Sequence, residues 1–146
     1  MKIKPHLIVD GAAAAIDFYR HVFDAREVDR YVDQKLGNRV VHATLRIGDS
    51  EISLADEARD WKNHSPRSLN GSPVILTLEV ADARAVGARM EAAGATVVYP
   101  IEDQFYGERQ GRLEDPFGHL WILTQRLKEM TPEEIQRGVD AYPHGG

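Results

Sequence analysis

Two histidines in strand-like segments are the residues of this sequence best suited to chemistry. His6 lies in "KPHLIV" and His42 lies in "RVVHATLRI", so both could face a cleft. Because imidazole titrates near neutral pH, either ring could serve as a general base or as a hydrogen-bond partner for a ligand. The alternative for each is a half-buried histidine bonded to a neighbour. Their presence in the same half of the chain favours a role in a pocket.

A second candidate is the segment "DQFYGERQGRLEDP", which combines aromatic and basic side chains. Phe105 and Tyr106 precede a glycine, and Arg109 and Arg112 follow it. Aromatic rings at the edge of a cleft can stack on a planar ligand, and an arginine can hold an anionic or carbonyl group. An ordinary loop with a solvated arginine explains the same residues equally well.

The composition excludes several other kinds of site. The chain has no cysteine, which rules out disulfides, thiolate catalysis and cysteine-based metal centres. No nucleophile motif or phosphate-binding glycine loop occurs, and paired acids such as Glu51 with Asp56 are typical of solvated surfaces. The net charge of -5 without a basic cluster disfavours nucleic acid and anionic membranes as partners. No segment reads as a membrane span or a secretory signal, so we expect a cytoplasmic protein.

The elements that must position these residues occur twice along the chain. An expected strand at 4–9 is followed by helical spacing in "AAAAIDFYRHVF", with Asp10 as the expected cap. The strand expected at 73–80 is followed in the same way by a helix that opens at Asp82 and stops at Gly94. Each strand and helix pair then precedes three strand-like runs. These are 26–32, 39–47 and 50–55 in the first half, and 96–101, 109–114 and 119–125 in the second.

The sequence therefore predicts an α+β protein built from two βαβββ modules related by a pseudo-twofold. We expect a single domain over residues 1–146, with module one at 1–56, a linker at 57–72, module two at 73–125 and a tail at 126–146. Curved mixed sheets beside helices leave a concave face. Two such modules side by side should form a cleft for a small molecule.

The tail should contain one short helix. Thr131 and Glu134 have the spacing of a capping box at its start. Ile135 and Val139 are its only larger apolar residues, so we expect this helix to dock on the body or on a second subunit. The final residues, 141–146, should be loose.

Several motifs resemble the vicinal oxygen chelate superfamily, which has the glyoxalase, bleomycin resistance and dioxygenase fold. They are "VDGAAAAIDFYRHVFDA", "LEVADARAVGARMEAAGA" and "DPFGHLWIL", while "FYGERQGRLEDPFGHLWIL" and "TPEEI" are similar to its PhnB-like branch. Each motif alone is weak, but their order and spacing span almost the whole chain. One departure is Asp24, where the branch usually has glycine. Aspartate tolerates a left-handed conformation, so we expect the turn to be kept.

The resemblance also implies where a divalent metal would bind. Metal-dependent members supply a ligand from the first strand of each module and a glutamate from the last. These positions fall on Lys4 and Ile75 in the first strands, and on Ser53 and Ile122 in the last. An ammonium group, two aliphatic chains and one hydroxyl cannot form the required shell of oxygen and imidazole ligands. We therefore expect no metal cofactor.

If the ligand positions are shifted by two residues along a strand, the side chains still point from the same face of the sheet, and the expectation of no metal changes. Such a shift would allow a divalent metal site built from His6, His42 and Glu51. Glu79 is then the only further candidate near the first strand of module two.

The resemblance also implies structural or ligand-contacting roles for four side chains. His119 matches the histidine of the "DPFGH" motif and should be structural, and Trp121 should pack in the core beneath a helix. Ile122 should line the concave face. Trp61 lies in the polar linker, where antibiotic-binding relatives often carry an aromatic residue that covers the ligand. Packing on its own domain is the competing explanation for Trp61.

Three competing functions follow. The first is a non-enzymatic protein whose cleft sequesters a small, partly aromatic molecule such as an antibiotic or a toxic metabolite, with His6, His42 or Arg112 setting its orientation. The second is a lyase, isomerase or dioxygenase that uses a shifted metal site or a metal-free histidine as acid and base. A third is that the chain mainly assembles with itself or with a protein partner. We expect a homodimer, since these folds often pair modules between chains.

Overall fold

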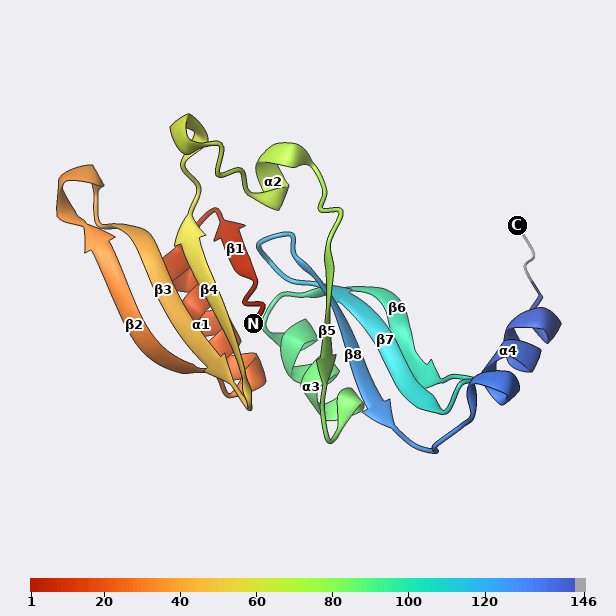
Figure 1. Cartoon of the computed structure of the whole chain (residues 1–146). Coiled ribbons are helices and arrows are strands. Elements are labelled where there is room, and N and C mark those ends of the chain that lie inside the picture. The colour runs from red at the N-terminus through yellow and green to blue at the C-terminus, as the bar shows by residue number, and fades with distance from the viewer. Residues whose placement is uncertain (144–146) are drawn as a thin grey trace.

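Two similar modules form the body of the protein (Figure 1). The structure, a computed structural model, describes residues 1–143. Module one contains β1 (His6–Val9), α1 (Ala12–Phe23), β2 (Arg26–Asp33), the 3-10 turn η1 (Gln34–Leu36), β3 (Arg39–Ile47) and β4 (Ser50–Asp56). Module two contains β5 (Ile75–Glu79), α3 (Ala83–Ala92), β6 (Thr96–Asp103), β7 (Glu108–Glu114) and β8 (Leu120–Arg126). The predicted βαβββ repeat is confirmed.

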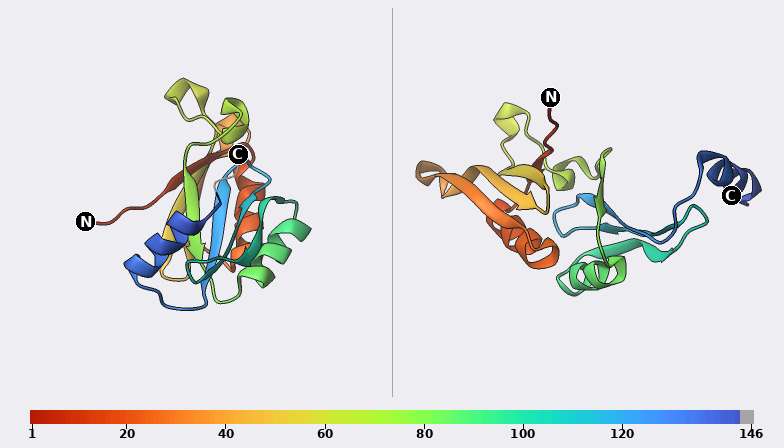
Figure 2. Two further views of the ribbon diagram at one scale, coloured as in Figure 1. Left: turned by 90° about the vertical axis from the view of Figure 1, so that its right-hand side faces the viewer. Right: turned by 60° about the horizontal axis from the view of Figure 1, so that its bottom comes forward.

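Each module folds into a four-stranded mixed sheet with one helix on its back. The strand orders are β1-β4-β3-β2 and β5-β8-β7-β6. The first and last strands of each module are parallel, whereas the other neighbours are antiparallel. Figure 2 shows α1 and α3 on the same side of the two sheets. The opposite sides of both sheets therefore form two open faces that point the same way.

The two modules share one apolar core. Tyr19 of α1 is fully buried, and its ring centroid lies 5.6 Å from that of Trp121 in β8. Trp121 is 2% exposed and also packs 4.8 Å from the ring of Phe23, which confirms the prediction of a core residue beneath a helix. Because α1 belongs to module one and β8 to module two, these rings join the modules.

The start of α1 corrects one prediction. Asp10 is not its cap, since Gly11 occupies the N-cap position with φ 99° and no side-chain hydrogen bond. The carboxylate of Asp56, at the end of β4, instead accepts from the backbone N–H groups of Gly11 and Ala12 at 3.2 and 2.7 Å. Asp10 forms an ion pair with Arg67 of the linker. The parallel pairing of β1 with β4 brings Asp56 to the helix start, a proximity that sequence spacing does not reveal.

Other predicted helix boundaries are confirmed. The side chain of Asp82 accepts from the backbone N–H of Ala85 at 3.1 Å and caps α3. Gly94 has φ 109° and Asp24 has φ 53°, so both turns use the left-handed conformation that was expected. The helices of both modules are thus placed by signals in the local sequence. Among residues 1–143, no helix combines the length and the apolar character needed to cross a membrane.

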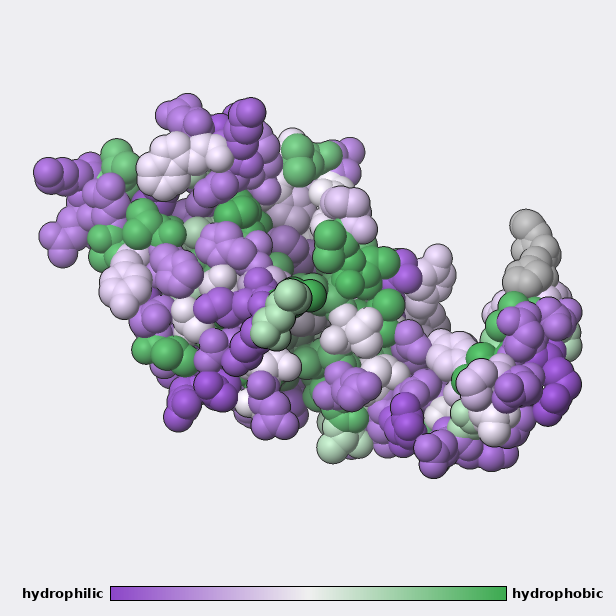
Figure 3. All heavy atoms as spheres, viewed as in Figure 1, coloured by the Kyte–Doolittle hydropathy of each residue, from purple (hydrophilic) through white to green (hydrophobic). Residues whose placement is uncertain are grey.

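The linker and the last helix lie outside the two sheets. They contain η2 (Arg59–Trp61), α2 (Pro66–Leu69) and α4 (Pro132–Ala141). The predicted capping box is present, because Thr131 and Glu134 accept from each other's backbone N–H groups. Figures 1 and 3 show α4 standing away from the body, beyond the second sheet. Of the tail end predicted to be loose, Ala141 belongs to α4 and residues 144–146 lie outside the described residues.

Candidate functional site

Matching rows of paired residues cross the two open faces. The first row is His6, Ser53, Thr44 and Asp29, and the second is Thr77, Ile122, Arg112 and Tyr99. Directly paired residues project from the same face of a sheet, so each row is continuous. A shift of register precedes Asp29 and Tyr99 in equivalent places, consistent with the pseudo-twofold. The rows mark the middle of the predicted concave surface.

A stack of three rings lies on the first open face. The imidazoles of His6 and His42 have centroids 5.7 Å apart and an angle of 15° between their planes. Tyr31 of β2 continues this ring stack, 6.3 Å from His42. Ser53 Oγ lies 2.6 Å from His6 Nδ1, and Thr44 Oγ1 lies 3.2 Å from His42 Nε2. These buried hydroxyl groups fix the two imidazoles, so a planar ligand can extend the stack at either end.

The surroundings of His6 favour a neutral imidazole. Partial burial lowers its pKa below the ordinary value of 6.5, and the positive charges of His42 and Lys4 lower it further. A neutral imidazole has one donor and one acceptor nitrogen. Since Nδ1 is engaged by Ser53, the Nε2 atom is the one available to a ligand.

Beside His6 the linker and β1 enclose a crevice of about 340 Å³, here named the linker crevice. Its walls come from β1, α2 and the segment before β5, and they are mostly apolar with three histidines. The residues include Ile8, Pro66, Leu69, Pro73, Val74 and Leu76, with His6, His64 and His119. Small-molecule sites typically enclose about 300–1,000 Å³. The crevice therefore has room for a small ligand at the His6 end of the ring stack.

The second open face has a different chemistry. Ile122 lies on this face between Thr77 and Arg112, as predicted for a residue of the concave surface. The guanidinium of Arg112 lies over the ring of Tyr99, 5.2 Å from its centroid. The row thus offers an aliphatic, a hydroxyl and a cationic group side by side.

Phe105 and Tyr106 are adjacent in sequence but serve different contacts. The ring of Phe105 lies 5.4 Å from that of Tyr142 at the end of α4. It also lies so close to Gly138 of α4 that a Cβ atom there would be 2.4 Å from the ring. The hydroxyl of Tyr106 donates to the side chain of Gln110 in β7 at 2.7 Å. Phe105 therefore anchors α4, whereas Tyr106 borders the second open face.

Trp61 and His119 make local contacts. The side chain of Trp61 is 65% exposed, and the guanidinium of Arg39 lies 5.7 Å from its ring centroid. Trp61 thus contacts Arg39 of β3 in its own chain. His119 Nε2 lies 2.9 Å from the backbone oxygen of Ile8. This bond joins module two to β1, in agreement with a structural role for His119.

The expected metal-ligand positions lie on or just before strands that the structure pairs in parallel. The register places His6 opposite Ser53 and Thr77 opposite Ile122, so the expected positions Lys4 and Ile75 come two residues earlier in the chain than these partners. The four directly opposed residues offer one imidazole, two hydroxyl groups and one aliphatic side chain. These groups do not fit the ligand shell of a divalent metal.

The shifted metal site is not assembled around the two histidines. The carboxylate of Glu51 forms ion pairs with Arg46 at 2.8 Å and with Lys4 at 4.0 Å. Within residues 1–143, no group of three or more histidine or acidic side chains lies close enough together to hold a metal ion. Glu51 therefore belongs to a network of ion pairs with Arg46 and Lys4 at the start of β4.

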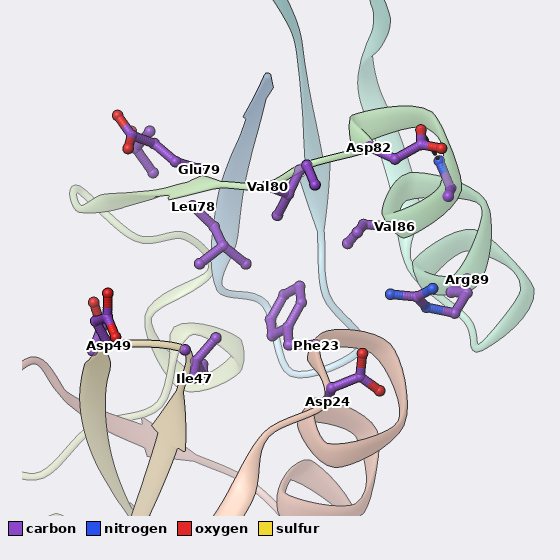
Figure 4. Close-up of a pocket in the computed structure, with 15 residues that line it drawn as sticks. Phe23, Asp24, Ile47, Asp49, Leu78, Glu79, Val80, Asp82, Val86 and Arg89 are labelled. Carbon is purple, nitrogen blue, oxygen red and sulfur yellow. Dashed lines mark hydrogen bonds between the residues drawn. The ribbon is translucent and has the colours of Figure 1, made fainter. Parts of the chain in front are cut away.

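A larger cleft than the linker crevice, of about 920 Å³, lies at another place between the modules. Its walls are the end of α1, the turn between β3 and β4, the end of β5 and the start of α3. Figure 4 shows Phe23, Leu78 and Val80 converging on its middle, with the carboxylates of Asp24 and Asp49 at the rim. Glu79, the further candidate for a shifted metal site, lines this cleft, but none of the residues expected to contact an organic ligand does.

Tyr31 and Tyr99 belong to the site but are not apparent from the sequence. Tyr31 pairs with His42 across β2 and β3, and Tyr99 pairs with Arg112 across β6 and β7. Counting residues outward from each hairpin turn is the sequence signal that could have suggested these pairs. This count gives the wrong partners here, because β2 and β6 each contain a register shift between the turn and the pair.

This fold agrees with a family match. Residues 4–123 match the Glyoxalase/Bleomycin resistance protein/Dioxygenase superfamily. The chain belongs to this superfamily, as its motifs indicate.

Three similar proteins illustrate the relationship. An uncharacterized protein of Mycobacterium tuberculosis is 42% identical over 146 residues, which cover 98% of this chain and 85% of the relative. The structure of a PhnB protein from Bacillus cereus has a TM-score of 0.64 and 24% identity, over 86% of this chain and 99% of that one. The fosfomycin resistance protein FosX from Listeria monocytogenes has a TM-score of 0.67 and 17% identity, over 92% and 96%. The two solved structures share the fold alone.

Proposed function

We propose that this chain is a non-enzymatic protein that binds and sequesters a small, partly aromatic molecule without a metal cofactor. The observation that carries the proposal is the ring stack of His6, His42 and Tyr31, which ends beside the linker crevice. A planar ligand would extend the stack at its His6 end and bury its apolar part in the crevice. His6 and His42 would set its orientation, with Arg112 on the other open face as a further polar contact.

The walls of the crevice support a ligand held by apolar burial. Leu69 and Val74 are each 60% exposed, although they line a concave surface. Covering such side chains contributes about 25 cal/mol for each Å² of apolar surface removed from water. A ligand that fills the crevice would therefore gain affinity from these residues and orientation from the rings.

A role in resistance to an antibiotic or a toxic metabolite is the biological form that we propose for this binding. The superfamily name includes a bleomycin resistance protein, and FosX is described as a fosfomycin resistance protein. Sequestration requires a binding site and no chemistry, which suits the residues present. We also propose a cytoplasmic location, in keeping with the sequence.

A second candidate function rests on the contact between His6 and Ser53. A neutral imidazole 2.6 Å from a hydroxyl group can act as a general base, so the chain would be a metal-free lyase or isomerase. A metal-dependent lyase or dioxygenase has less support, because Glu51 is held by Arg46. If His6 is a general base, His6→Gln should abolish turnover of the substrate while the substrate still binds. If the chain is a binding protein, the unaltered chain should show no turnover at all.

We further propose that the chain forms a homodimer in which α4 of each copy packs on β2 of the other. α4 has no buried residue, and Val139 and Tyr142 on it are 38% and 52% exposed. Along β2 and the following turn, four large apolar side chains are exposed by 42–58%. These are Val28, Tyr31, Val32 and Leu36. Exposed apolar side chains gathered along one strand and its turn are typical of a surface that binds another protein chain.

Charge complementarity points to a second copy as that partner. The α4 segment carries three carboxylates and one guanidinium, those of Glu133, Glu134, Asp140 and Arg137. The hairpin formed by β2 and β3, which would face α4 of the other copy, carries Arg26, Lys35 and Arg39. None of these three forms an ion pair within residues 1–143. Although β2 also carries Glu27, Asp29 and Asp33, these three unpaired cations can meet the carboxylates of α4, and the contact can form twice in a symmetric dimer.

Metal content tests the metal-free part of the proposal. Protein purified without a chelator should contain far less than one equivalent of zinc, nickel, iron or manganese by mass spectrometry of the elements. Stoichiometric metal that disappears from the double variant His6→Gln/Glu51→Gln would show that a shifted site exists and would overturn the proposal.

A further inference from the structure

The guanidinium of Arg112 has no acceptor within the described part of the chain. It lies at the centre of the second open face, where β7 pairs with Ile122 of β8 on one side and with Tyr99 of β6 on the other. Within residues 1–143, its Nε atom is enclosed without a hydrogen-bond partner, and the guanidinium makes one specific contact, with the ring of Tyr99. Burying a donor without an acceptor is unfavourable, because the lost hydrogen bonds to water are not replaced.

Other arginines of the same sheet show that carboxylates are at hand. Arg109, three residues earlier in β7, donates from Nε to Asp103 at 2.7 Å. Arg126 of β8 lies 3.5 Å from Glu108. The chain as a whole carries a net charge of -5, so acidic groups are not scarce. The fold therefore leaves one guanidinium, at the middle of the open face, available to an outside acceptor.

We infer that Arg112 and Tyr99 form an oxyanion subsite, so that the ligand is an organic acid with an apolar body. The Tyr99 ring contacts the guanidinium, and the terminal nitrogens, which have no acceptor within residues 1–143, can donate two parallel hydrogen bonds to a carboxylate or phosphoryl group. Ile122 offers apolar contact beside that group, and the Thr77 hydroxyl offers a further hydrogen bond. This inference rests on the proposed binding function and names its class of ligand.

The first row contains a carboxylate that competes with a ligand as the acceptor for Arg112. Asp29 occupies the place that Tyr99 holds in the second row, and its Oδ1 atom is likewise enclosed without a partner. In a symmetric dimer, Asp29 of one copy could neutralise Arg112 of the other. In that case no subsite for a ligand anion exists, and the experiment must separate the two outcomes.

The test follows the Nε–Hε signal of Arg112 by NMR in the full chain, assigned with Arg112→Lys. Inorganic phosphate and benzoate should shift this signal, and benzoate should bind about tenfold more tightly than benzamide, its neutral analogue. Arg112→Gln should reduce this preference to about twofold or less, while the matched control Arg109→Gln should keep it. A signal that neither anion moves, or that Asp29→Asn moves without any added anion, would overturn the inference.

The outcomes also separate this inference from the proposed function. If the anions shift Arg112 but no aromatic probe binds better than phosphate, the subsite stands and aromatic sequestration fails. If neutral aromatic probes bind and benzoate has no advantage over benzamide, the binding function stands and the acid-binding subsite fails.

Discussion

The Nδ1 atom of His6 and the hydroxyl oxygen of Ser53 lie 2.6 Å apart at the β1 edge of the first open face. Partial burial, His42 and Lys4 lower the pKa of His6 below 6.5. Removing the repulsive ring in His42→Gln should therefore raise the pKa of His6, as measured by NMR titration of the ring protons. His64→Gln is the matched control and should leave the value unchanged. A pKa of His6 above 6.5 in the unaltered chain would contradict this picture of the site.

The same shift predicts how stability depends on pH. Because the pKa of His6 is lower in the folded chain, the unfolded chain binds more protons at His6 in mildly acidic solution. The contribution of His6 to stability is complete above its unfolded pKa and declines as the pH falls through that value. His6→Gln should lose less stability than the unaltered chain between pH 7.5 and pH 5 in urea unfolding. Parallel losses in the two proteins would show that His6 has no such role.

Asp115 is predicted to be the polar residue whose loss costs most stability. Its carboxylate is 3% exposed and accepts from the Tyr19 hydroxyl at 2.5 Å, from Trp121 Nε1 at 2.9 Å and from two backbone N–H groups. Asp115→Asn should cost about 2–4 kcal/mol of unfolding free energy, because an amide places a donor against donors. Tyr19→Phe should cost about 1–2 kcal/mol, since it removes one bond. Equal stability of Asp115→Asn and the unaltered chain would refute this assignment.

Gly111 shows how the second module departs from the first. A Cβ atom there would lie 2.8 Å from the backbone of Ile101, which cannot move aside without disturbing β6. The equivalent residue of module one is Ala43, which is fully buried and tolerated. Gly111→Ala should destabilise the protein by about 1–3 kcal/mol, measured by denaturant unfolding. The control Ala43→Gly should cost about 1 kcal/mol or less in the same assay, and a neutral Gly111→Ala would mean that β6 is more adaptable than the structure indicates.

The dimer prediction concerns the exposed side of α4. Val139→Asp adds a charge to the surface that we place against β2 of a second copy, so the dissociation constant should rise by about tenfold or more. Leu69→Asp is the matched control, because Leu69 is 60% exposed on α2, away from β2 and α4. Sedimentation velocity over a range of concentrations measures both. A monomeric unaltered chain, or equal weakening by the two variants, would rule out this interface.

Much of the fold could be predicted because its signals are local. The repeat, the caps of α3 and α4 and the turn at Asp24 depend on residues close in sequence, and the structure confirms each of them. The cap of α1 could not be predicted in this way. It comes from Asp56, more than forty residues beyond the helix start, and nothing near Asp10 indicates it.

The site was harder to predict because it depends on register between distant strands. His6 and Ser53 are 47 residues apart in sequence, and no local pattern shows that they lie opposite each other. The contact of Phe105 with α4 likewise depends on where the tail returns to the body. His42 and Arg112 could be singled out by residue type, whereas their partners Tyr31 and Tyr99 required the structure.

Ligand-induced stabilisation of metal-free protein tests the central claim most directly. Melting temperatures should be measured across a panel of planar antibiotics and aromatic acids, with His42→Ala beside the unaltered chain. At least one compound, at about a hundred times its dissociation constant, should stabilise the unaltered chain by about 2.7 kcal/mol and should lose most of this effect in His42→Ala. Stabilisation that appears only after a divalent metal is added, or that His42→Ala leaves intact, would contradict metal-free binding by the ring stack.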